Sequence, residues 1–261
     1  MKSRRKSRVT RRKSRKSIRK RNMKGGDNLK YSILITAYES KGKAVEFIRN
    51  NLEKIISQRY RPIEVIISDQ SKDDLVENEV KKIDNKGIEV VYKRYNKNYG
   101  NPCENWNNAL KYSKGDLIHY LALDDYLSDE LSVQNIIDLY NNISFKWIAM
   151  THKIDPTGDI FIPKWNDNIL QNNTISGPSA IVISKSLKHI KLDPQFKCFL
   201  DLDWYYRLYK EAGKPYIYDK VTWINRHHPE QLSNKVCIGK EYDDEINKLK
   251  KKYGDPIPLS L

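Results

Sequence analysis

The sequence predicts an α/β fold in which a mainly parallel sheet is flanked by helices on both faces. Short, nearly continuous apolar segments alternate with segments whose apolar residues recur at helical spacing, and acidic residues stand directly after some of the apolar segments. Strands that are buried on both faces have near-continuous apolar sequences, and alternation of strand and helix is typical of a parallel sheet. We expect one domain over residues 27–261, preceded by a tail over residues 1–26.

The first half of the domain shows the alternation most clearly. The predicted strands cover residues 31–37, 63–68, 88–92 and 117–123, and the predicted helices between them cover residues 41–58, 74–84 and 103–113. In the first of these helices Val45, Ile48, Leu52 and Ile55 recur at the spacing of one helical face. This half therefore predicts three strand–helix units followed by a fourth strand.

The second half is less regular. We expect helices over residues 129–141, 201–213 and 241–253, and extended segments over residues 146–151, 159–162, 180–184 and 216–225. Gly213 would end the middle helix, which is rich in aromatic residues. No linker in this half is long enough to separate a further domain.

The first 26 residues differ in composition from the rest of the chain. They contain 14 Lys or Arg and no acid, so they supply most of the net charge of +15 and leave +1 for residues 27–261. With few large apolar side chains this segment cannot offset its ordering entropy, and we expect it to be disordered. It could contact nucleic acid or an anionic membrane, serve as a nuclear-localisation segment, or be a solvated arm without a partner. A transit peptide is disfavoured because an amphipathic apolar stripe is missing.

The sequence lacks signals for secretion or membrane insertion. No apolar segment follows the basic residues, and none approaches the ~20 apolar residues that a membrane helix needs. Cys103, Cys198 and Cys237 are odd in number and widely spaced, without a metal-ligand pattern. Such usage is typical of a reducing compartment, and we expect these cysteines to do no chemistry. The chain is therefore predicted to be soluble and cytoplasmic, with peripheral membrane or nuclear targeting by the tail as an open alternative.

Two adjacent carboxylates, Asp124 and Asp125, follow the apolar run 117–123 directly. They cannot be core residues, and ligands of open α/β sheets bind just outside the carboxyl ends of the strands. A pair of this kind suits a hard divalent cation that holds a diphosphate, although an acidic turn has the same composition. Because neighbouring side chains of an extended backbone point to opposite faces, one carboxylate could meet the metal and the other a sugar hydroxyl.

An ordered series of short motifs resembles the family 2 glycosyltransferases, which have the Rossmann-like GT-A fold. The motifs, in chain order, are Thr36-Ala37-Tyr38, Ser68-Asp69-Gln70-Ser71, Asn98-Tyr99-Gly100, Asn107, Leu123-Asp124-Asp125, Asp201 ahead of Arg207, and His227-His228. The likeness covers residues 30–234. The sequence departs from the family pattern at Gln70, Trp106 and Leu200, where the family has Gly, Arg and Glu.

The resemblance also implies a role for each matching residue. The implied nucleotide-binding residues, in a first half spanning residues 27–125, are Thr36, Tyr38, Asp69, Asn98, Gly100, Asn107 and Asp124. The implied metal ligands for Mn²⁺ or Mg²⁺ are Asp125, Asp124 and His228, with His227 as an alternative to His228. The implied catalytic base is Asp201, with Asp203 as the alternative, in an acceptor-binding half spanning residues 126–261.

The reaction that the resemblance implies moves a sugar from a nucleoside diphosphate to an acceptor hydroxyl. A divalent metal would stabilise the departing diphosphate, and an inverting transfer needs one base for the acceptor's proton. Asp69 could accept a hydrogen bond from N3–H of uracil, which favours a UDP-sugar, and Tyr38 could stack on the base. A helix amino end lowers the pKa of Asp201, whereas burial beside its apolar neighbours raises it.

Metal-dependent transfer from a UDP-sugar to a glycan, protein or lipid acceptor is the predicted function, of hexosyltransferase type. It requires the acids at positions 69, 125 and 201 to converge on one cleft at the rim of the sheet. The alternative is a catalytically inactive GT-A-fold protein that binds polyanions through its tail, which Leu200 favours. A sugar-phosphate nucleotidyltransferase is disfavoured, because no Gly-rich basic loop follows the first strand. The aromatic residues Trp165, Trp204, Tyr205 and Tyr206 could line an acceptor platform or belong to the core.

Overall fold

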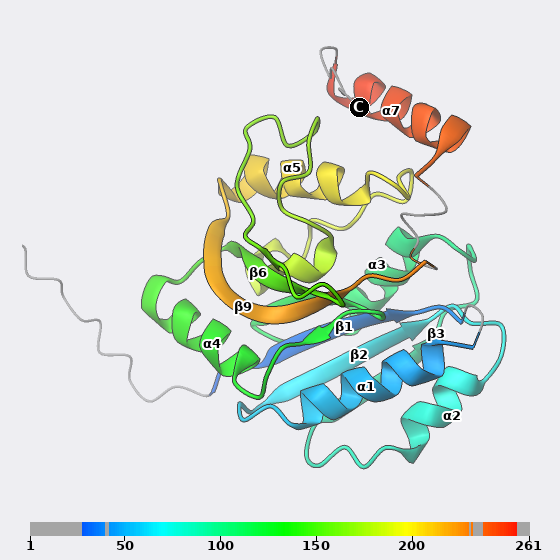
Figure 1. Cartoon of the computed structure of the whole chain (residues 1–261), viewed down its shortest axis with the longest axis vertical. Helices are drawn as coiled ribbons and strands as arrows, with labels where there is room; N and C mark the ends of the chain where they lie inside the picture. The colour runs from blue at the N-terminus through cyan, green and yellow to red at the C-terminus, as the bar shows by residue number, and fades with distance from the viewer. Residues whose placement is uncertain (1–27, 40–41, 230, 232–236, 255–261) are drawn as a thin grey trace, which may run out of the picture.

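The computed structural model describes residues 28–39, 42–229, 231 and 237–254. Through these residues runs one nine-stranded sheet, with helices against both faces (Figure 1). The strand order is β3-β2-β1-β4-β8-β6-β9-β5, and β7 pairs with β6 off this path. The predicted α/β fold with a mainly parallel sheet is therefore confirmed, whereas the predicted basic tail lies outside the described residues.

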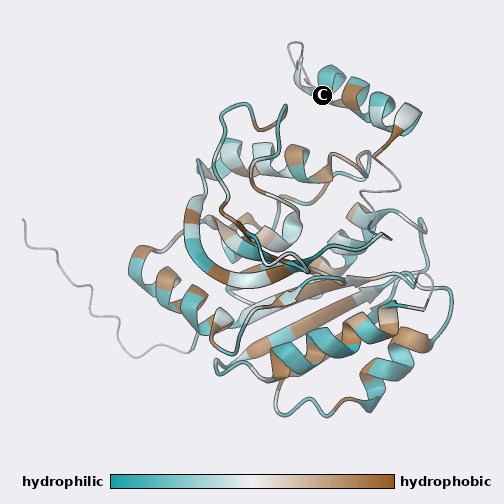
Figure 2. Cartoon of the chain, in the orientation of Figure 1, coloured by the Kyte–Doolittle hydropathy of each residue, from teal (hydrophilic) through white to brown (hydrophobic). Residues whose placement is uncertain are grey.

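The first half of the chain forms the parallel part of the sheet. Its strands are β1 (Tyr31–Ala37), β2 (Ile63–Asp69), β3 (Glu89–Arg94) and β4 (Leu117–Ala122), and its helices are α1 (Ala44–Ile56), α2 (Leu75–Lys82) and α3 (Pro102–Tyr112). α1 and α2 lie below the sheet in Figure 1, and α3 lies above it. β2 is buried along its whole length and β1 along nearly all of it, as expected for strands covered on both faces. Figure 2 shows the apolar residues gathered on the strands, while the outer face of α1 is hydrophilic.

The second half extends the sheet with mixed pairing. Its strands are β5 (Tyr126–Leu127), β6 (Trp147–Asp155), β7 (Ile160–Phe161), β8 (Ile181–Ser184) and β9 (Tyr216–Arg226). Its α-helices are α4 (Ser132–Ile143), α5 (Leu200–Ala212) and α7 (Gly239–Tyr253), and two 3₁₀ turns cover Pro178–Ala180 and Lys185–Leu187. β8 is antiparallel to both β4 and β6, so it joins the two halves into one sheet. Every helix in the described parts of the chain is too short or too polar to cross a bilayer.

Several element boundaries differ from the sequence predictions. The fourth strand ends at Ala122, before Leu123, because the chain turns there and Asp125 N–H donates to the Ala122 carbonyl at 3.1 Å. The helix expected at residue 129 begins at Ser132, since the Asp129 carboxylate first accepts the Leu131 amide at 2.7 Å. Asp124 and Asp125 consequently lie in a turn and not in extended backbone.

A buried carboxylate organises the amino ends of the parallel strands. Glu64, fully buried at the start of β2, accepts hydrogen bonds from the Ser32 hydroxyl at 2.5 Å and the Gly115 amide at 3.0 Å. Its second oxygen lies 2.8 Å from the Lys30 ammonium, and this ion pair offsets the cost of burying the charge. The carboxylate thus fixes the register of β1, β2 and the turn before β4.

Two of the three cysteines contradict the sequence expectation. Cys198 and Cys237, 39 residues apart, form a disulfide that links the segment before α5 to the segment before α7. Cys103 is free and buried, and burial raises the pKa of its thiol. The expectation that the cysteines do no chemistry is therefore wrong for the pair, and a disulfide is unusual in the reducing compartment that the sequence analysis favoured.

We expect Gly115→Ala to destabilise the fold. A Cβ at this position would lie 2.4 Å from Ser32 Oγ and 2.8 Å from the Lys30 carbonyl oxygen, so backbone has to shift. Overpacking of this kind costs about 1–3 kcal/mol, which thermal unfolding would detect. Gly177→Ala is the matched control, because its Cβ meets nothing within 4 Å. Equal melting temperatures for the two variants would contradict this packing.

The disulfide predicts the number of reactive thiols. In denaturant without a reductant, a maleimide should label one cysteine per chain of protein purified in air, namely Cys103. After reduction it should label all three cysteines. Intact-mass spectrometry counts the labels, and three labels without prior reduction would show that Cys198 and Cys237 are thiols.

Candidate functional site

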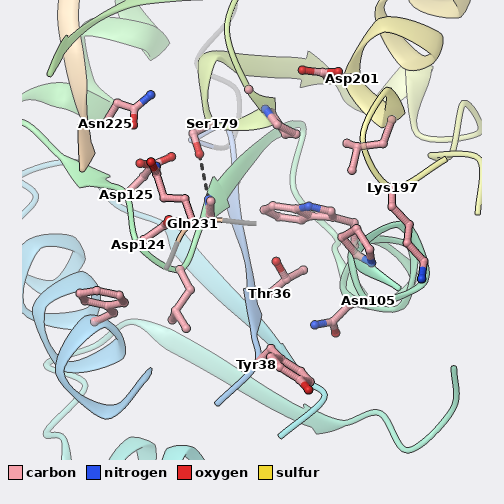
Figure 3. Close-up of a pocket in the computed structure, with 18 of the residues that line it drawn as sticks. Thr36, Tyr38, Asn105, Asp124, Asp125, Ser179, Lys197, Asp201, Asn225 and Gln231 are labelled. Carbon is pink, nitrogen blue, oxygen red and sulfur yellow. Dashed lines mark hydrogen bonds between the residues drawn. The ribbon is translucent and has the colours of Figure 1, made fainter. Parts of the chain in front are cut away.

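A pocket of about 720 Å³ opens at the carboxyl ends of β1 and β4. Both halves of the chain contribute to its wall, among them Thr36 and Asp125 from the first half and Asp201 and Asn225 from the second. Figure 3 shows Asp124 and Asp125 on one side of this space and Asp201 on the other. The volume is in the range of small-molecule sites, and the place is where open α/β sheets bind ligands.

The turn that carries the acid pair is held by groups from three other elements. Asn51 of α1 donates from Nδ2 to the Leu123 carbonyl at 2.7 Å. The Ser179 hydroxyl accepts the Ala122 amide at 2.9 Å, shown as a dashed line in Figure 3. From the end of β9, the Arg226 amide donates to Asp125 Oδ1 at 3.2 Å. The position of the carboxylates is therefore fixed by the fold and not only by the turn itself.

The two carboxylates are poised for a cation. Asp125 is 7 % exposed, and burial together with the neighbouring charge of Asp124 raises its pKa well above the usual range. His228 Nε2 lies 3.1 Å from Asp124 Oδ2, which brings the predicted histidine to the acid pair. Among the residues that the structure describes, no three His, Cys, Asp or Glu side chains form a complete metal-ligand cluster. The protein groups thus fit a divalent cation as a partial ligand set that a diphosphate would complete.

Asp201 occupies the opposite wall, in the first turn of α5. Asn173 Nδ2 donates to its Oδ2 at 2.6 Å, and the Leu202 amide donates to its Oδ1 at 2.8 Å. Although the residue is partly exposed at the pocket wall, loss of hydration is the largest influence on the carboxyl group and raises its pKa to about 7. The hydrogen bonds act in the opposite direction but do not outweigh desolvation. A carboxylate with this pKa can accept a proton near neutral pH.

The structure brings most of the predicted site residues together. The predicted residues that line the pocket are Thr36, Tyr38, Gly100, Asp124, Asp125, Asp201, His228 and its alternative His227. The predicted residues that do not line it are Asp69, Asn98, Asn107 and Asp203. The expected convergence of three acids on one cleft therefore holds for Asp125 and Asp201 and not for Asp69.

Asp69 is fully buried and lies behind the pocket wall. Its carboxylate accepts hydrogen bonds from the Ser71 amide at 2.7 Å and from the Tyr92 hydroxyl at 2.6 Å. The next residue, Gln70, lines the pocket and donates from Nε2 to the carbonyls of Lys97 and Asn98 at 3.0 and 3.1 Å. The Asn98 carbonyl thus holds the side chain of Gln70, which faces the pocket, and the Asp69 carboxylate fixes the backbone next to Gln70.

Asn107 and Asp203 hold neighbouring segments in place. Asn107 exchanges two hydrogen bonds with the backbone of Leu192, at 2.8 and 3.0 Å. Asp203, fully buried, accepts from Arg207 and lies 2.5 Å from both the Lys252 ammonium and the Tyr253 hydroxyl. Neither side chain is directed into the pocket.

Several lining residues escaped the sequence analysis. They include Phe47, Asn105, Ser179, Lys197, Asn225 and Gln231. Ser179 follows Gly177-Pro178, a turn signal directly before a strand, which could have marked it. The others come from helices, loops and, for Asn225, strand β9, at positions without a motif. Trp106 also lines the pocket, at 4 % exposure, so the departure from the family's Arg places an indole there.

The aromatic residues considered for an acceptor platform pack in or against the core. Trp204 and Tyr205 are fully buried. Trp165 is partly buried and packs against Trp147 and Tyr209, with ring centroids 5.9 and 4.9 Å apart. Tyr206 is also partly buried, with its ring centroid 4.8 Å from that of Tyr253. None of the four lines the pocket.

Solved structures of other proteins share the fold of this chain. The chain is similar to the crystal structure of S. aureus TarS 1-349 in complex with UDP-GlcNAc, with a TM-score of 0.70 and 16% identity over 86% of this chain and 65% of that chain. It is also similar to the mannosyltransferase PcManGT from Pyrobaculum calidifontis in complex with GDP-Man and Mn²⁺, with a TM-score of 0.58 and 12% identity over 76% of this chain and 57% of that chain. This chain thus spans 65% of the TarS structure's length. No curated protein sequence matches it.

The family of this chain is shown by its sequence. Structural likeness at such low identity shows a shared GT-A fold. The profile described as "Glycosyl transferase family 2", by contrast, matches residues 32–222, which include Asp69, Asp125 and Asp201. The chain therefore belongs to glycosyl transferase family 2.

Proposed function

We propose that this protein transfers a sugar, with inversion, from a nucleoside-diphosphate sugar to an acceptor hydroxyl. The observation that carries the proposal is the placement of Asp124 and Asp125 on one wall of a pocket and Asp201 on the opposite wall. Membership of glycosyl transferase family 2 supports the reaction class. A UDP-sugar is the donor that we favour, and the UDP-GlcNAc complex of the similar TarS structure supports it.

The donor nucleotide is assigned to the first half of the chain, residues 27–125. Tyr38, at the end of β1, is 45 % exposed and offers a ring face for stacking on the base. Thr36 adds a hydroxyl at the same strand end, and Gly100 lines the pocket without a side chain. Asp69 acts indirectly, by fixing the backbone of Ser71 and the ring of Tyr92.

The acid pair is assigned to the diphosphate end of the donor. Asp125 and Asp124, together with His228, would hold Mn²⁺ or Mg²⁺, and the Mn²⁺ complex of PcManGT supports a divalent metal. When bound, the ion supplies Lewis-acid stabilisation of the charge on the leaving diphosphate. Burial of Asp125 beside Asp124 favours this role, because a cation removes the repulsion between the two charges.

Asp201 is assigned to the acceptor, which the second half, residues 126–261, would bind. Its carboxylate takes the proton of the acceptor hydroxyl while that oxygen forms a bond to the anomeric carbon. The bond from this carbon to the diphosphate oxygen breaks on the opposite face, so the configuration inverts. We assign the base to Asp201 and not to Asp203, because Asp203 is paired with Arg207 and Lys252 outside the pocket.

Asp125→Asn should abolish metal-dependent donor binding. UDP with Mn²⁺ should raise the melting temperature of the wild type, because a ligand that binds only the folded state stabilises it. The variant should show no such shift, and its hydrolysis of the donor should fall about a thousandfold if the metal contributes several kcal/mol. The exposed Asp138→Asn serves as the charge-matched control. A wild-type shift that survives in Asp125→Asn would contradict the assignment.

The pH dependence of turnover should report the Asp201 carboxyl group. The base must be deprotonated, so kcat/KM should fall as the pH drops through about 7, the value to which burial raises the pKa of Asp201. The Asp201→Asn variant should show no such acidic limb, and its transfer rate should fall about 10²–10⁴-fold. A limb near the ordinary value of 3.8 would contradict the role of a buried base.

A further inference from the structure

The segment that leads into α5 is held by a residue from a different helix. The backbone amides of three consecutive residues before and at the helix start donate to the Glu245 carboxylate of α7, from Lys197 at 2.7 Å, Cys198 at 2.8 Å and Phe199 at 3.0 Å. The N-cap residue is Phe199, whose side chain cannot accept a hydrogen bond. Glu245 therefore binds the backbone that leads directly into the first turn of α5.

Glu245 is held firmly in this position. Its own exposure is 5 %, and Leu249, one helical turn later on the same face, is fully buried. At the end of α7, Lys252 lies 2.5 Å from Asp203 of α5 and 2.6 Å from Asp193. The Cys198–Cys237 disulfide joins the same two segments at the other end of α7. The helix is thus fastened to α5 at both ends, with Glu245 between the fastenings.

The segment that Glu245 holds, residues 197–199, contains residues that line the pocket. Lys197 and Cys198 line the pocket, and Asp201 follows Phe199 by two positions in the first turn of α5. The placement of the Asp201 carboxylate therefore depends on where this turn begins and how it is oriented. A displacement of about 1 Å at a reacting group can cost about a hundredfold in rate.

We propose that Glu245 is a positioning residue for transfer, whose carboxylate fixes the first turn of α5 and thereby the place of Asp201 in the pocket. This inference rests on the proposed function, because it assumes that Asp201 accepts the proton of the acceptor. Glu245 also acts through its charge, because this negative charge helps to raise the pKa of Asp201.

The charge of Glu245 has a second measurable effect, which is on the pKa of Asp201. The ionisable side chains around Asp201 and across the pocket from it are Lys197, Tyr205, Glu245, Tyr38, Lys43, Asp124, Asp125, His227 and His228. Asn173 is neutral, and Tyr205 donates its hydroxyl to the Ser176 carbonyl. Removal of the negative charge at position 245 should therefore lower the pKa of Asp201 and move the acidic limb of the rate profile to lower pH.

The test compares Glu245→Gln with the wild-type full-length chain in donor binding and in turnover. We expect kcat to fall about 10- to 100-fold while the affinity for UDP with Mn²⁺ stays within about twofold, because the donor contacts are on the opposite wall. The acidic limb should shift to lower pH. Glu241→Gln, an exposed acid on the same helix, is the charge-matched control and should behave as the wild type.

A second control separates positioning from general loss of stability. Gly115→Ala acts at the amino ends of the strands and leaves the contacts of α7 with residues 197–199 intact, so it should lower the melting temperature without lowering kcat. If Glu245→Gln does not fold, Glu245→Asp carries the test, because it keeps the charge but draws the carboxylate back from the amides. It should lower kcat with the acidic limb in place.

The outcomes distinguish this inference from the function on which it rests. A wild type that turns over a donor, beside a Glu245→Gln variant with the same kcat and the same pH profile, overturns only the role of Glu245. Equal losses of kcat in Gly115→Ala and Glu245→Gln would also overturn it, since they would reflect stability alone. A folded wild type that turns over no sugar nucleotide would overturn both.

Discussion

Two adjacent carboxylates confined to a tight turn after β4 are the constraint around which the site is built. Burial and mutual repulsion make this pair costly, and only contacts from distant elements keep it in place. Asn51 of α1 fixes the Leu123 carbonyl, Ser179 fixes the Ala122 amide, and the end of β9 supplies the Arg226 amide. A group of positive charge, such as a divalent ion on a diphosphate, relieves the cost. The turn is therefore best understood as part of a binding site and not as a feature that stabilises the fold.

The opposite wall has a different kind of support. Asp201 stands where a helix begins, a place that lowers a carboxyl pKa, yet desolvation raises its pKa to about 7. The amides of the three residues directly before this helix are bound by Glu245. In the proposed reaction the two acids therefore have different tasks: Asp125, beside a like charge, would bind a cation, and Asp201, desolvated in the pocket wall, would accept a proton.

Sequence patterns predicted the features that depend on residues close together in the chain. Apolar runs and helical spacing identified the order of strands and helices along the first half of the chain, and motif order placed Asp125 and Asp201 at one pocket. The failures involve partners that are distant along the chain. No residue near Asp69 in the sequence indicates that Tyr92, on the neighbouring strand, donates a hydrogen bond to its carboxylate. No residue near Asp203 indicates that Lys252 and Tyr253 of α7 bind its carboxylate. Cys198 and Cys237 are unremarkable in spacing, and only the packing of α7 against α5 makes them neighbours.

A crystal structure of the protein with Mn²⁺ and an unreactive UDP-sugar analogue tests the account most directly. It should show an anomalous peak for manganese between the Asp125 carboxylate and the diphosphate, with the anomeric carbon turned toward Asp201 across the pocket. Manganese bound elsewhere, or a sugar that faces away from Asp201, would contradict the arrangement of the two walls as the reaction centre.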